Sequence, residues 1–266
     1  MTELLRTLET YYDTVPRASA TVEEVGPFTL FVRSDPSGWG FYARPRLGLD
    51  VPVDAGDVKQ VRDRQRERGV AENLEWVHET TPSLLDAATA DGLAVEQCPL
   101  LALPTDSPDT ANTPAGLESD GPGRVEVLPA DSPDLAAVTG AVHAGFDESH
   151  DGAPLDPGNR AEQIRSGLLV VVAAYDGQGA VIGGGSHSPR GTTTELMGIA
   201  VLPRARRRGV GAAITHALVE DARRREVRTI FLSAQDVAVA RVYERVGFVR
   251  VGTACMAEPP ASDPGR

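Results

Sequence analysis

The residue spacing with the clearest chemical meaning lies in IAVLPRARRRGVGAA, residues 199–213. Arg206, Gly209 and Gly211 fill the pattern R-x-x-G-x-G between an apolar run that predicts a strand and a run that predicts a helix. The first turn of a helix leaves backbone N–H groups unpaired and carries the positive end of the macrodipole. Glycines at such a turn let an anion approach the backbone closely, so the spacing predicts a cradle for a diphosphate.

This cradle stands out because the chain is otherwise acidic, with a formal net charge of -12. Consecutive arginines add positive charge at the same helix end. The alternative interpretation, a buried strand followed by an ordinary solvated turn, is the weaker one because of the motif's context. The residues predicted to hold the diphosphate are Arg206, Arg207, Arg208, Gly209, Val210, Gly211 and Ala212.

The elements that must position the cradle follow from hydrophobic periodicity and turn residues. The order is a strand, two helices, three strands, and then helix, strand, helix and strand, which predicts an α/β fold with a mixed sheet. The expected strands span 124–128, 168–176, 180–188, 193–203, 228–234 and 248–258, and the expected helices span 132–146, 159–167, 209–226 and 236–247.

Composition divides the chain into two lobes. Residues 105–123 are rich in Pro, Gly, Ser and Asp and are predicted to be a linker, and residues 259–266 are predicted to be a disordered tail. The cradle is therefore expected in a domain at 124–258, with a smaller α/β lobe at 1–104.

The smaller lobe is predicted to be a degenerate copy of the larger one. Aligned without gaps on Gly92 and Gly247, residues 75–95 match residues 230–250 as strand, helix, glycine turn and strand. RERGVA, residues 66–71, also fits R-x-x-G-x-[GA], but it ends a predicted helix. Gly69 is therefore interpreted as a C-cap, and this lobe as shortened and free of cofactor.

Three parts of the larger domain, in order, resemble the GNAT superfamily of N-acetyltransferases: the strand with its R-x-x-G-x-G helix, the strand IFLSA, and the ending VYERVGF. A lone R-x-x-G-x-G is weak, but the three together are specific. The resemblance covers about Arg124 to Ala257 and suggests a tandem form. It implies that acetyl-CoA donates an acetyl group directly to an amine of a small molecule or protein.

The resemblance also implies individual roles. The backbone of Ile199, Ala200 and Val201 would pair with the pantetheine arm like an added strand, with an N–H near Ile199 polarising the thioester carbonyl and Gly198 marking a bulge. Asp236 stands where many relatives carry Asn near this arm, and Val239 replaces a usual small residue.

Two side chains are candidates for proton transfer. Tyr243, in VYERVGF, is where relatives commonly place the acid that protonates the departing thiolate; the alternative is a tyrosine packed on an amphipathic helix. Glu195 is a candidate base, equally well explained as an ordinary charged strand start, and period-two alternation predicts that it shares a face with Met197, Ile199 and Val201.

Other reactive residue types lack the context that their chemistry needs. His143, His150 and His187 form no triad or metal spacing, and Ser233 has no nucleophile-elbow context. Cys98 and Cys255 are too few for a disulfide framework and are expected in strands. No metal site is predicted.

The acidity argues against nucleic acid or anionic membrane as partners, since phosphates would be repelled. The N-terminal residues do not form a signal peptide and no run is long enough to span a membrane, so a cytoplasmic protein is expected. A homodimer is left open. The alternative function is a non-catalytic acyl-CoA-binding sensor or interaction module.

Overall fold

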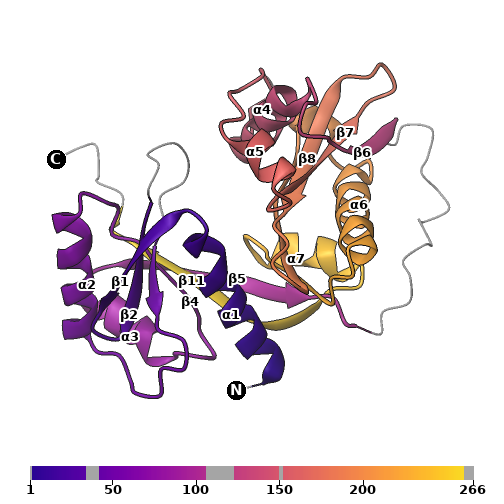
Figure 1. Ribbon diagram of the computed structural model, residues 1–266. Coiled ribbons are helices and arrows are strands. Elements are labelled where there is room, and N and C mark those ends of the chain that lie inside the picture. Colours follow the sequence, from indigo (N-terminus) through magenta and orange to yellow (C-terminus); the bar gives the residue numbers. More distant parts are fainter. Residues whose placement is uncertain (1, 34–41, 106–122, 150–151, 261–266) are drawn as a thin grey trace. The chain divides into compact units, whose positions relative to one another are not determined.

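The computed structural model describes residues 2–33, 42–105, 123–149 and 152–260 (Figure 1). Most of the predicted linker at 105–123 and most of the predicted tail at 259–266 lie outside these residues. Contacts divide the chain into two units. The N-terminal unit holds residues 1–100, 233–237 and 251–266, and the C-terminal unit holds residues 101–232 and 238–250.

Hydrogen bonds connect the described strands in the order β1-β2-β3-β4-β11-β5-β10-β9-β8-β7-β6. Most neighbouring strands are antiparallel, whereas β3 with β4 and β9 with β10 are parallel. The predicted α/β fold with a mixed sheet is thus confirmed.

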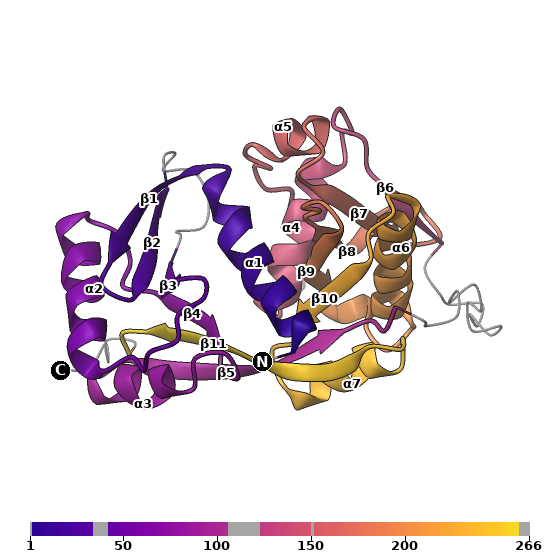
Figure 2. The ribbon, with the colours of Figure 1, turned by 60° about the horizontal axis from the view of Figure 1, so that its bottom comes forward.

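The C-terminal unit is a twisted sheet covered on both faces (Figures 1 and 2). In β8, a Cβ added at Gly184 would point at Val138 of α4, and one added at the next residue, Gly185, would point at Ile214 of α6. Successive strand residues face opposite ways, so α4 and α6 cover opposite faces. Its elements are β6 (Arg124–Val127), α4 (Leu135–Phe146), α5 (Arg160–Arg165), β7 (Val170–Tyr175), β8 (Val181–His187), β9 (Thr193–Val201), α6 (Val210–Arg224), β10 (Thr229–Ser233) and α7 (Val237–Glu244).

Most of the last strand, β11, groups with the N-terminal unit. Residues Ala254 to Ala257 pair antiparallel with β4, and residues 251–266 belong to that unit by contact. The sequence-based domain at 124–258 therefore does not coincide with one contact unit. The elements of the N-terminal unit are α1 (Glu3–Arg17), β1 (Ala20–Val25), β2 (Phe28–Arg33), β3 (Ala43–Pro45), α2 (Ala55–Glu67), β4 (Leu74–Val77), α3 (Ser83–Ala90), β5 (Ala94–Ala102) and β11 (Val249–Glu258).

The core of the N-terminal unit lies between its sheet and two helices. Leu74 and Trp76 of β4 are buried together with Val58 of α2 and Leu84 of α3. Helix α1 packs against β1 and β4. Alternation along β3 places Ala43 in the core and Arg44, which is also buried, on the other face.

A buried ion pair occupies the α1 face of this unit. Arg44 is 1% exposed and donates a hydrogen bond to Glu9 of α1, whose other carboxylate oxygen accepts from Thr80. Glu75 of β4 is half-buried beside them. Burial raises the pKa of Glu75 to about 7, against the opposing effect of the Arg44 charge. Removing one partner of such a buried ion pair strongly destabilises the folded state, because the other charge is left buried without a partner.

The order of elements supports the predicted duplication. In the N-terminal unit the succession β1, β2, β3, α2, β4, α3, β5 repeats as β7, β8, β9, α6, β10, α7, β11. The turn that anchored the alignment is also repeated in detail. Leu93 N–H donates to Ala88 O, and Phe248 N–H donates to Tyr243 O, each just after a glycine with positive φ.

Cys98 and Cys255 lie in strands, as predicted, and both are buried free thiols. Burial raises the pKa of Cys98 to about 11 and that of Cys255 to about 12, which disfavours the reactive thiolate. Among the described helices, none combines the length and apolarity that a membrane crossing requires.

Candidate functional site

Strands β9 and β10 of the C-terminal unit pair at the start of β9 and diverge beyond it. Their parallel register pairs Thr193 with Thr229 and Glu195 with Phe231. Beyond this point β9 continues to Val201, whereas β10 ends at Ser233. The divergence leaves one edge of β9 able to accept an extended chain as an added strand.

A β-bulge lies in this free part of β9. The register with β8 pairs Gly184 with Ala200 but Ser186 with Met197, so β9 contains one extra residue. Gly198 has φ +61, a conformation that suits glycine, and the Ser186 hydroxyl donates to Met197 O at 3.3 Å. The bulge predicted at Gly198 is confirmed.

The same bulge corrects the predicted face of Glu195. Met197 pairs with Ser186 and therefore faces α4, as does Glu195 two residues earlier. Ile199 faces α6, because a Cβ on Gly185 would lie 2.8 Å from its side chain. Glu195 thus does not share a face with Ile199 and Val201, since the extra residue interrupts period-two alternation.

Helix α6 begins beside the end of β9 with its first turn open. Its N-cap is Gly209, in the left-handed conformation with φ +77, so no side chain caps the following amides. Ala213 is the first amide to bond within the helix, to Gly209 O at 3.0 Å. A Cβ on Gly211 would meet only Val201 Cγ2, at 4.0 Å. The space over Gly211 therefore fits an anion held by backbone amides.

The corresponding helix of the N-terminal unit is closed to an anion. The N-cap of α2 is Asp54, whose carboxylate accepts from Asp57 N–H, while the Asp57 carboxylate accepts from Asp54 N–H. Counting from each N-cap, Asp54 corresponds to Gly209 and Asp57 to Ala212. Two carboxylates stand where α6 has none, and they would repel a diphosphate.

The R-x-x-G pattern in the N-terminal unit is a helix end. Helix α2 stops at Glu67, and Gly69 follows with φ +65. Gly69 N–H bonds to Arg66 O and Val70 N–H bonds to Gln65 O, which is the Schellman arrangement. The predicted helix stop is confirmed, although the C-cap residue itself is Arg68, one position earlier.

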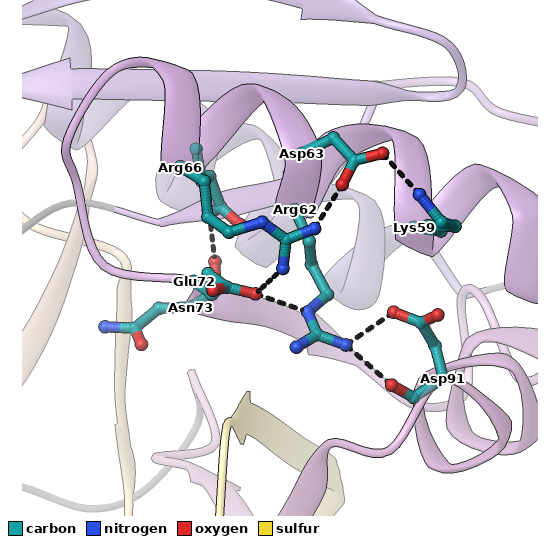
Figure 3. Close-up of polar contacts among 8 residues, drawn as sticks. Lys59, Arg62, Asp63, Arg66, Glu72, Asn73 and Asp91 are labelled. Carbon is teal, nitrogen blue, oxygen red and sulfur yellow. Dashed lines mark hydrogen bonds and ion pairs between the residues drawn. The ribbon is translucent and has the colours of Figure 1, made fainter.

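Figure 3 shows that the arginines of α2 are bound by neighbouring acids. Arg66 contacts Glu72 and Asp63, and Arg62 contacts Glu72 and Asp91, with Lys59 on the other oxygen of Asp63. Arg66, the first residue of the R-x-x-G pattern in this unit, is therefore held in an ion-pair network within the N-terminal unit.

The arginines of the α6 cradle differ among themselves. All three arginines are exposed, and Arg207 has φ +63. The Arg206 guanidinium instead contacts the protein: it donates to Val201 O at 3.1 Å and to Gly145 O at 2.5 Å. Among the described residues, Arg206 is thus the arginine of the three that is held by backbone carbonyls at the ends of β9 and α4.

Tyr243 lies in the same contact unit, on α7. Its side chain is buried, and its ring packs edge-on against Phe248 with centroids 6.2 Å apart. Burial raises the pKa of the Tyr243 hydroxyl to about 12. The phenol therefore stays protonated at neutral pH, which suits a proton donor and not a base.

The other predicted residues have varied places. Glu195 is half-buried on β9. Asp236 is exposed and belongs to residues 233–237, which group with the N-terminal unit and not with the cradle. Ser233 is exposed at the end of β10, His143 is exposed beside Asp147, and His150 lies outside the described residues.

His187 is part of a buried network that the sequence did not indicate. It is 0% exposed, and its ring nitrogens lie 3.0 Å from Thr194 Oγ1 and 3.0 Å from Asp221 Oδ2. Asp221 also accepts from Arg225 at 2.5 Å. Burial opposes ionisation of Asp221, but the hydrogen bonds from His187 and Arg225 outweigh it and lower its pKa to about 2. The network fastens β8 and β9 to α6.

Comparisons with known proteins agree with the fold. Residues 141–248 match the model of the acetyltransferase (GNAT) family. Comparison with curated proteins finds no significant match to the sequence.

Several solved structures share the fold. A GCN5-related N-acetyltransferase from Kribbella flavida has a TM-score of 0.72 at 20% identity, with 98% of each chain covered. A GCN5-related N-acetyltransferase from Sphaerobacter thermophilus has a TM-score of 0.54 at 18% identity, covering 78% of this chain and 67% of that one. A tandem GNAT protein from the clavulanic acid biosynthesis pathway has a TM-score of 0.54 at 17% identity, covering 89% and 79%.

Proposed function

We propose, from the membership of residues 141–248 in the GNAT acetyltransferase superfamily, that this protein transfers an acetyl group from acetyl-CoA to an amine. The observation that carries the proposal is the open first turn of α6 beside the diverging end of β9. An anion-binding helix end and a strand edge suited to an extended arm together match the two parts of coenzyme A.

The donor would be held largely by backbone groups. The amides of Val210, Gly211 and Ala212 would bind the diphosphate, with Arg207 and Arg208 adding positive charge. The β9 edge at Ile199 to Val201 would pair with the pantetheine arm. Because the fold fixes these amides in advance, binding would order few protein side chains.

The chemistry would be a direct attack without a covalent enzyme intermediate. The amine nitrogen forms a bond to the thioester carbon as the bond from carbon to sulfur breaks. Glu195, on the α4 face of β9, would take the ammonium proton directly or through water. Tyr243 would give its proton to the departing thiolate and regain one from solvent.

The N-terminal unit would hold no donor. Its α2 start is capped by Asp54 and Asp57, and Ala88 stands at the position that corresponds to Tyr243. Both the cradle and the acid are thus missing from the described part of this copy. Its role would be to mediate contacts between subunits.

The test is thiol release from acetyl-CoA with a panel of small-molecule and peptide amines, using the full chain. Transfer to at least one amine, with a strong loss in Tyr243→Phe, would support the proposal. The phenylalanine ring keeps the packing on Phe248, so the variant isolates the hydroxyl. The rival function, a non-catalytic acyl-CoA sensor, would give calorimetric binding of acetyl-CoA without turnover for every amine. Absence of binding would reject both.

A further inference from the structure

The end of α4 and the end of β9 meet closely in the C-terminal unit. A Cβ added at Gly145 would lie 2.9 Å from Ala200 Cβ and 3.2 Å from both the N and O atoms of Val201. Gly145 is the second-last residue of α4, and Val201 is the last residue of β9. Any side chain at residue 145 would push the helix end away from the strand.

Arg206 joins these two ends. Its Nη2 donates to Gly145 O at 2.5 Å, its Nε donates to Val201 O at 3.1 Å, and its Nη1 lies 3.4 Å from Glu148 Oε1. The last carbonyls of a helix have no partner within it and carry the negative end of the macrodipole. A guanidinium at this place satisfies one of those carbonyls and complements the dipole.

We propose that Arg206 is a positioning residue, which fixes the end of α4 on the end of β9, and not a ligand of the donor diphosphate. The inference rests on the proposed function, because the strand edge so fixed is the one that would receive the pantetheine arm. It revises the role that the R-x-x-G-x-G motif implies for Arg206. The forked guanidinium reaches two carbonyls at once, which a lysine ammonium at the same place would not do.

Two donors separate the roles. S-acetyl pantetheine carries the thioester and the arm but lacks the diphosphate and nucleoside of acetyl-CoA. Loss of charge-assisted hydrogen bonds predicts that Arg206→Gln lowers kcat/KM about 10-fold or more with either donor, by similar factors. Arg206→Lys would show the same pattern. The comparison variant Arg208→Gln would lose far more with acetyl-CoA than with the pantetheine thioester.

The overturning result is equally specific. If Arg206→Gln impaired turnover of acetyl-CoA but left that of S-acetyl pantetheine intact, and Arg206→Lys restored it, Arg206 would be a diphosphate ligand. If the unmodified protein used neither donor, the proposed function would fail.

A second readout needs no donor. Amide hydrogen exchange should accelerate in Arg206→Gln at residues 143–149 and 201–209 together, because one side chain holds both segments. Arg204→Gln removes an exposed arginine from the same loop and should accelerate neither segment in this joint way. Unchanged protection of 143–149 in Arg206→Gln would refute the positioning role whatever the activity shows.

Discussion

The contrast between α6 and α2 leads to a direct test of the cradle. Ala212 is the third helical residue of α6, the place that Asp57 occupies in α2. Ala212→Asp would therefore give α6 part of the acidic start of α2. The substitution leaves helix formation intact, since a carboxylate in the first turn favours the helix by about 0.3 to 1 kcal/mol.

The effect on binding follows from Coulomb's law. One added charge about 5 Å from a phosphate charge is unfavourable by roughly 3 kcal/mol at an effective dielectric constant near 20 and by about 1 kcal/mol in bulk water. Calorimetry should therefore show coenzyme A binding about 5-fold to 150-fold more weakly. The penalty should shrink as salt is raised, because the site is open to solvent.

Ala212→Asn is the matched control, because it adds nearly the same volume without the charge. Equal weakening in the Asp and Asn variants would mean that shape and not charge is responsible. Unchanged affinity in Ala212→Asp, with the protein folded by thermal melting, would refute the assignment of the diphosphate to this helix end.

The remaining predictions concern three titratable side chains. Tyr243→Phe should lower kcat about 100-fold or more while leaving coenzyme A affinity unchanged. Because the pKa of Tyr243 is about 12, ionisation of this side chain should cause no fall of kcat below about pH 11. Stopped-flow or thiol-release profiles of both proteins would check this. Asp221 has a folded-state pKa of about 2 against 3.8, so the roughly 2 kcal/mol of stability it contributes is present above pH 4 and lost as the pH falls toward 2. In denaturant unfolding, the free energy of unfolding of Asp221→Asn should therefore fall less steeply with decreasing pH below about 4. An unchanged pH dependence would contradict the role of the His187 and Arg225 bonds. Glu75 has the opposite sign: its pKa is raised to about 7, so stability falls as the pH rises from about 4.5 through 7. Glu75→Gln should raise the melting temperature more at pH 8 than at pH 5, and a uniform shift would count against it.

Much of the architecture was predictable from local pattern. The strand ending at Val201, the helix opening at Gly209 and the repeated glycine turns at Gly92 and Gly247 all depend on residues close together in the chain. Apolar periodicity and glycine conformations are local properties, so a single sequence reveals them. The interpretation of Gly69 as a helix stop succeeded for the same reason.

The face of Glu195 could not be predicted in this way. Alternation assumes a regular strand, and the bulge at Gly198 is fixed by pairing with β8, more than ten residues away. A single extra residue reverses every later side chain, so Ile199 turns to α6 while Glu195 faces α4.

The sequence by itself determined the features on which the proposed cradle depends, because the glycine spacing and the helix-end charge lie within a dozen neighbouring residues. Only the tertiary structure decided which side chains near this helix start are held by other polar groups. Arg206 turns to the carbonyls of Gly145 and Val201, and β11 pairs with β4 of the other copy. Such choices depend on which polar groups folding brings together and must satisfy, and that information is distributed over the whole chain.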